Sequence, residues 1–306
     1  MWKIYSLFGF DNFFLPRTLK TQLHSAKESS ISHHNFHDSP YNRIKEIAKS
    51  KCYSDDDQQD FKLEVPFEYP SPAQKSEFPM LSKHDSNPQE IHFTFLEKAD
   101  EFLRELILKT ESGFEGFELI HEDPVSSHEH LKIYLKSYLN KEKHRINIYR
   151  SEWKIPCSPE SFLDFLNDTP LQISLDPNIS EFMSFEDQGA NVFLMYLLYK
   201  KMFVVESRDF IYLKHYKLID EINQVWGYIT KSIEHDKYPE TKGRIRGEIL
   251  LSGNIIKKIN ENESKVILYS EINLKINLPV FLMKTKTISE MKKYVESFLK
   301  YLKAKN

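Results

Sequence analysis

Six strand-like segments follow one another in the second half of this chain, with no helical pattern between them, and this succession limits the fold more than any other feature. They are residues 182–186, 191–199, 208–216, 225–233, 243–251 and 266–272. Turn residues such as Asp187-Gln188-Gly189 separate them. Strands that follow each other through short turns pair with their neighbours, so we expect one antiparallel meander.

An amphipathic segment follows the last strand. Apolar residues recur in it at helical spacings of three and four, namely Ile288, Met291, Val295, Phe298 and Leu302. Thr287 and Glu290 form a capping box, so we expect this helix to begin at Thr287. A curved antiparallel sheet with one long helix across it is an α+β helix-grip fold.

The first half of the expected domain mixes helices and strands. Apolar residues spaced by three and four predict a helix over 88–109. Strands are expected at 117–121, 131–135 and 146–155. Ser158-Pro159-Glu160 indicates the start of another helix, because Ser caps, Pro fits the first position and Glu suits the positive end.

Residues before this domain differ in composition. From about residue 20 to 89 the chain is rich in Pro and Ser and lacks a sustained apolar period. We therefore expect a mostly disordered N-terminal extension over 1–88 and one domain over 89–306. The aromatic start, 1–15, is interpreted as part of a flexible tail; a membrane or partner contact and a mitochondrial transit peptide are the alternatives.

Composition excludes several classes of protein. The net charge of −3 does not favour nucleic-acid binding, and no apolar run of 18 residues predicts a membrane-spanning helix. Cys52 and Cys157 lie far apart and predict no disulfide framework, which fits a cytoplasmic protein. His33, His34 and His37 lack partners at metal-ligand spacing, so we expect no metal site and no cofactor.

Several short motifs occur in an order that is informative as a set. They are Leu175-Asp176-Pro177-Asn178-Ile179, Ser207-Arg208-Asp209-Phe210, Trp226 with Ser232, Gly243-Arg244-Ile245-Arg246-Gly247-Glu248, Gly253-Asn254-Ile255-Ile256 and Asn273-Leu274-Lys275-Ile276-Asn277-Leu278-Pro279. Together they resemble the START family of lipid-transfer domains over about residues 90–306. Leu175 departs from that pattern, since the family usually has Trp there.

The resemblance implies a tunnel between sheet and C-terminal helix that holds one lipid, a phospholipid, sphingolipid or sterol. It implies a monomer that touches membrane surfaces transiently, where the C-terminal helix and a loop at 257–265 open. The candidate lining and gate residues are Asp176, Phe193, Met195, Leu197, Arg208, Phe210, Trp226, Tyr228, Arg246, Met291, Val295 and Phe298. All of the apolar members are also compatible with an ordinary core.

Choline recognition in the family uses an aromatic cage and an Arg–Asp pair. This chain keeps Asp176 but has Gln172 at the Arg position, Leu197 at a Trp position and Phe210 at a Tyr position. We therefore expect a weak preference for phosphatidylcholine.

Three charged or titratable positions allow two interpretations each. Arg208 and Asp209 are either a structural pair or a polar anchor near the head group. Arg246 is either a surface residue or the partner of a carboxylate such as Asp176 or Glu271. His215 is expected to be an exposed strand residue rather than a catalytic base.

The sequence holds no nucleophile motif, phosphate loop or metalloprotease motif, so we expect no enzyme. A cyclase or hydrolase that uses the helix-grip cavity is one alternative. A lipid sensor or adaptor that acts through its N-terminal tail is another.

Overall fold

The structure is a computed structural model that describes residues 88–124, 129–201, 206–277 and 279–305, with side chains from Phe95 onward. The expected N-terminal extension, with its aromatic start, Cys52 and its three histidines, lies outside the described residues. The description below concerns the part of the chain from Pro88.

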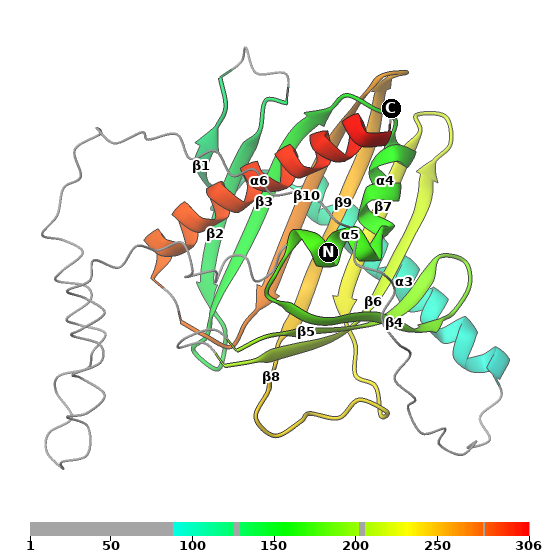
Figure 1. Ribbon diagram of the computed structural model, residues 1–306, viewed down its shortest axis with the longest axis vertical. Coiled ribbons are helices and arrows are strands. Elements are labelled where there is room, and N and C mark those ends of the chain that lie inside the picture. The colour runs from blue at the N-terminus through cyan, green and yellow to red at the C-terminus, as the bar shows by residue number, and fades with distance from the viewer. Residues whose placement is uncertain (1–87, 125–128, 202–205, 278, 306) are drawn as a thin grey trace, which may run out of the picture. The chain divides into compact units, whose positions relative to one another are not determined.

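One large sheet dominates this part of the chain (Figure 1). Its strands are β1 (Glu118–Glu122), β2 (Lys132–Leu139), β3 (Arg145–Ile155), β4 (Ile179–Asp187), β5 (Val192–Tyr199), β6 (Arg208–Asp220), β7 (Val225–Ser232), β8 (Ile245–Arg246), β9 (Glu248–Asn260) and β10 (Glu263–Asn273). The order is β1-β2-β3-β10-β9-β7-β6-β5-β4, and β8 pairs with β6 in parallel. The expected antiparallel meander is confirmed from β4 to β10 except for β8, and β10 also pairs with β3.

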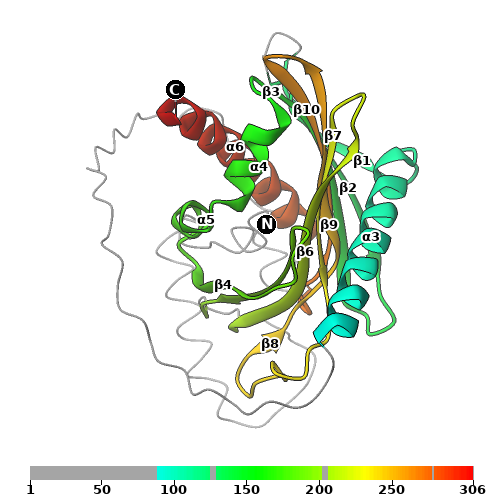
Figure 2. The same ribbon diagram turned by 90° about the vertical axis from the view of Figure 1, so that its right-hand side faces the viewer.

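Among the described residues, four helices cover the two faces of this sheet (Figure 2). Helix α3 (Pro88–Glu111) lies on the convex face. The concave face is covered by α4 (Pro159–Asn167), α5 (Thr169–Leu175) and the long α6 (Val280–Lys305). This is the helix-grip arrangement of α+β type that the succession of strands predicts.

The convex face is closed tightly by α3. Leu103 and Leu106 of α3 pack against buried residues of the central strands, such as Ile229 and Ile255. Gly253 permits this approach, because a Cβ atom there would lie 2.6 Å from Leu106 Cδ2 and would also collide with the carbonyl oxygen of Tyr228. With α3 in place, the central strands of the sheet are buried on both faces.

The predicted start of the C-terminal helix is wrong. Helix α6 begins at Val280, so Thr287 and Glu290 lie inside it and are buried. Met283 extends the buried stripe toward the N-terminus, since it packs with Leu135 and Tyr149. This tertiary packing outweighs the local capping pattern.

The predicted strand over 243–251 is also wrong in its bounds. The chain forms the short β8, and β9 begins at Glu248 and continues to Asn260. Residues 257–265, expected as an opening loop, therefore form the β9–β10 hairpin. Two of its lysines form ion pairs, Lys265 with Glu152 at 2.8 Å and Lys258 with Glu261 at 2.7 Å.

Candidate functional site

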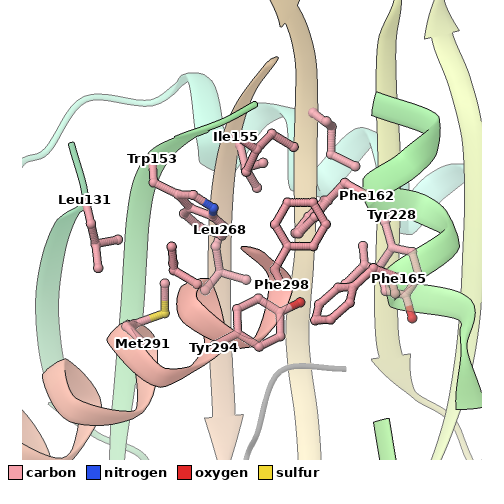
Figure 3. Close-up of a cluster of buried hydrophobic side chains, with 14 of the residues drawn as sticks. Leu131, Trp153, Ile155, Phe162, Phe165, Tyr228, Leu268, Met291, Tyr294 and Phe298 are labelled. Atoms are coloured by element: carbon pink, nitrogen blue, oxygen red, sulfur yellow. The ribbon is translucent and has the colours of Figure 1, made fainter. Parts of the chain in front are cut away.

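The concave face carries two apolar clusters. The first lies under α4 and α6, and we call it the α4–α6 cluster (Figure 3). It includes Leu131, Trp153, Ile155, Phe162, Phe165, Tyr228, Leu268, Met291, Tyr294, Val295 and Phe298. The Phe298 ring lies 4.9 Å from that of Phe162 and 5.0 Å from that of Phe165, so aromatic contacts join α6 to α4.

The second cluster lies farther along the same face, and we call it the β5–β6 cluster. Its buried members are Met195, Leu197, Tyr199, Phe210, Tyr212, Ile249 and Leu274, with Phe193 packed against them. Phe210 lies directly against Gly247, where a Cβ atom would collide with its ring. A side chain at position 247 would therefore displace Phe210.

A row of polar side chains separates the two clusters. Strand pairing places its members directly opposite one another across five strands, in the order Tyr149, Ser270, Ser252, Thr230 and Lys214. All five are buried. Ser252 Oγ donates to Ser270 Oγ at 3.2 Å, and Thr230 Oγ1 donates to the Ser252 carbonyl oxygen at 3.2 Å. We call this set the polar row.

Further polar atoms lie buried near the row. Ser151 Oγ, Trp153 Nε1 and Tyr212 Oη have no hydrogen-bond partner among the described residues. Burial raises the pKa of Tyr212 well above its usual value, so its hydroxyl stays protonated. Each such group is costly to leave unsatisfied, by about 1–3 kcal/mol. These three groups are therefore unused hydrogen-bond donors in the described part of the chain.

Exposed ion pairs tie the two ends of α6 to other elements. Lys284 Nζ lies 2.5 Å from Glu118 of β1, and Lys305 Nζ lies 2.9 Å from Asp164 of α4. Exposed pairs of this kind contribute about 0–1 kcal/mol each. The helix is therefore held chiefly by its apolar face, through Met291, the Val295 side chain and Phe298.

The Ser207-Arg208-Asp209 motif anchors β6 through three contacts. Ser207 Oγ donates to the Tyr199 carbonyl oxygen at 2.8 Å, and Arg208 Nε donates to the Leu274 carbonyl oxygen at 2.8 Å. Asp209 pairs with Arg246 at 2.9 Å. Burial lowers the pKa of Arg208 to about 10. The carboxylate of Asp209 thus pairs with Arg246, while Arg208 donates to a backbone carbonyl at the end of β10, an arrangement that fits a structural role for the motif.

The expected partners of Arg246 are wrong. Its carboxylate partner is Asp209, not Asp176 or Glu271, and it also donates to the Tyr238 carbonyl oxygen at 3.2 Å. Asp209 alternates with Phe210 along β6 and so lies on the convex face. The structure therefore separates Arg246 from the candidate residues of the concave face.

Asp176 and His215 are both buried. Asp176 is buried at the end of α5, where it accepts a hydrogen bond from the Asn178 amide at 3.1 Å. His215 was expected to be exposed, but it is buried. Its Nδ1 lies 3.1 Å from the Asn191 carbonyl oxygen, and its Nε2 lies 3.7 Å from the Asp100 carboxylate of α3. Burial lowers the pKa of His215, which favours the neutral imidazole.

The apolar candidates fall into the two clusters of the concave face. Trp226 and Tyr228 of β7 and Met291, Val295 and Phe298 of α6 belong to the α4–α6 cluster or pack against it. Phe193, Met195, Leu197 and Phe210 belong to the β5–β6 cluster or pack against it. Sequence reasoning missed the polar row. Its signal was a charged Lys214 directly after the apolar run Phe210-Ile211-Tyr212-Leu213 of the same strand.

Comparison with known proteins identifies the family. The sequence model of the START domain matches residues 99–306. The chain belongs to the START domain family. Human StAR-related lipid transfer protein 6 is 27% identical over 162 residues, which span 50% of this chain and 71% of that protein.

Solved structures of the START family share the fold. Human StAR-related lipid transfer protein 5 superposes with a TM-score of 0.53 at 15% identity, over 71% of this chain and 97% of the other. Human STARD10 superposes with a TM-score of 0.53 at 18% identity, over 67% and 82% of the two chains.

The described part of this START protein contains neither a membrane-spanning helix nor a metal-binding group. None of its described helices is long and apolar enough to span a bilayer. Its described His, Cys, Asp and Glu residues form no group that could hold a metal ion.

Proposed function

We propose that this START protein binds one lipid molecule between the concave face of its sheet and α6, and that it carries this lipid between membranes without chemical change. The observation that carries the proposal is the family match over 99–306, which spans the whole sheet and α6. The proteins it resembles in sequence and fold include two named as lipid transfer proteins. Residues 89–306 would be the lipid-binding domain, with 1–88 as an extension.

The energetics of the concave face support a lipid ligand. Burial of acyl or sterol surface contributes about 0.8 kcal/mol per methylene group, so the two apolar clusters can stabilise a long chain. A lipid can reach that face only if α6 moves away from it. The helix has weak ion pairs at its ends and an apolar inner face, and a membrane surface can replace both kinds of contact. Helix α6 is therefore the gate in this proposal.

Identification of the lipid that copurifies with the full chain tests the binding. We expect one lipid molecule per protein by native mass spectrometry, released on denaturation. A protein that stays empty after incubation with mixed vesicles would refute lipid binding. An empty protein that hydrolyses or cyclises a small substrate would favour the enzymatic alternative.

Hydrogen exchange tests the gate. The amides of α6 should exchange faster when vesicles are added, while those of β9 and β10 stay unchanged. Transfer of a fluorescent lipid between vesicles with no change in α6 exchange would contradict the gating role. The weak phosphatidylcholine preference stays a prediction. Gln172 supports it, because its Nε2 already donates to the Phe165 carbonyl oxygen at 2.7 Å.

A further inference from the structure

The polar row ends at an ammonium group. Lys214 lies on β6 directly opposite Thr230, so its side chain belongs to the concave face with the hydroxyl groups of the row. The residue is only 8% exposed. A lysine is rarely buried to this degree without an acidic partner.

The contacts of Lys214 leave its charge only partly compensated. Its Nζ donates to Asn167 Oδ1 at 3.2 Å and lies 4.4 Å from the centre of the Phe193 ring. No carboxylate of the described residues lies within ion-pair distance of it, and Asp187 acts on it from farther away. Helix α4 ends at Asn167, and the negative end of its dipole weakly favours the positive charge of Lys214.

Burial without a direct counter-ion has a measurable consequence. It lowers the pKa of Lys214 to about 8, so its ammonium form still predominates at neutral pH but is less stable than that of an exposed lysine. An anion brought within hydrogen-bond distance would reverse this cost and form a charge-assisted contact. In the same row the Ser270 hydroxyl, which accepts from Ser252 Oγ, keeps its own hydrogen for an oxygen atom of a ligand, whereas the hydroxyl hydrogens of Thr230 and Ser252 would have to leave their present acceptors.

We propose that Lys214 and the polar row bind the acidic group of the lipid, a carboxylate or a phosphate monoester or diester that bears a net negative charge. This inference rests on the proposed function and specifies its class of cargo. The acidic oxygens lie at the row, and the apolar part of the lipid extends into the neighbouring clusters. Zwitterionic and neutral lipids lack a net charge to offset the Lys214 ammonium.

Competitive loading of the full chain tests this assignment. The protein is incubated with vesicles that hold equimolar phosphatidylcholine, cholesterol, phosphatidic acid, phosphatidylserine and oleic acid, then re-isolated and analysed by mass spectrometry. We expect the acidic lipids to be enriched about tenfold or more over phosphatidylcholine. The share of phosphatidic acid, phosphatidylserine and oleic acid shows whether phosphate or carboxylate is preferred.

Variants assign the selectivity to one side chain. Lys214→Met should abolish the enrichment, and Lys214→Arg should keep part of it. Lys217→Met is the matched control, because Lys217 lies on the same strand but half exposed, with its Nζ 2.6 Å from Asp100. Its loading should equal that of the wild type. Circular dichroism verifies that each variant is folded.

The outcomes separate the two proposals. Wild-type protein that loads phosphatidylcholine or cholesterol as well as acidic lipids would overturn this inference and leave lipid binding intact. Wild-type protein that loads nothing would overturn the proposed function. An acidic preference that survives in folded Lys214→Met would show that Lys214 only fixes the end of α4, which also overturns the inference.

Discussion

Arg246→Met should destabilise the folded protein strongly, because it leaves a buried carboxylate without its partner. The Asp209 side chain is 2% exposed and that of Arg246 is 16% exposed. Two parallel contacts join them, Nε to Oδ1 at 2.9 Å and Nη2 to Oδ2 at 3.0 Å. Removal of one partner of a buried pair costs about 3–5 kcal/mol, a large part of a typical free energy of unfolding of about 5–15 kcal/mol.

Urea unfolding, followed by tryptophan fluorescence, measures this loss. Arg244→Met is the matched control, since it removes a single hydrogen bond of 2.7 Å to Tyr196 Oη and should cost about 1 kcal/mol. Adding Asp209→Asn to Arg246→Met removes the unpaired charge and should recover part of the loss. If the Arg246 and Arg244 variants lose equal stability, or if Asp209→Asn brings no recovery, the buried ion pair is not what holds β8 on β6.

Three further substitutions probe the packing and the buried charge. Gly253→Ala should cost about 1–3 kcal/mol in thermal unfolding, because its Cβ meets the Tyr228 carbonyl oxygen, whereas Gly113→Ala, with open space around it, should be near neutral. Phe298→Ala should cost about 3–5 kcal/mol and release copurified lipid; wild-type stability and retention would argue against α6 as a packed lid. Burial lowers the pKa of Lys214 from 10.5 to about 8, so the unfolded chain holds that proton to higher pH than the folded one. The buried tyrosines, whose pKa burial raises, affect both proteins equally, so the difference in free energy of unfolding between lipid-free Lys214→Met and lipid-free wild type isolates Lys214. The variant should be more stable below pH 8 by up to about 3 kcal/mol, and this difference should shrink as the pH rises from 8 to 10.5.

Local patterns predicted most of the fold because they reflect alternation and capping, which act over a few residues. The strands at 191–199 and 225–233 and the helix that begins after Ser158 are confirmed within a residue or two. The start of α6 was not predictable from the cap, because Met283 finds its partners on β2 and β3, far away in sequence.

Long-range pairing also explains the errors at the candidate site. The partner of Arg246 depends on the parallel contact between β8 and β6, which spacing does not reveal. His215 is buried because α3, from the start of the domain, lies over it with Asp100. The polar row exists only through the register of five strands, so its residues are scattered in sequence.

The pairing of β10 with β3 affects the order of events during synthesis. Ser264 of β10 lies opposite Ile155 of β3. Strands β1, β2 and β3 are synthesised first, so β3 lacks its partner strand β10 until nearly the whole domain has left the ribosome. Until then β3 presents an unpaired edge and an apolar surface, which are targets for chaperones and for aggregation. A premature stop between β9 and β10 would release a nascent chain with two half-sheets, and we expect it to be degraded rather than to accumulate as a smaller folded unit.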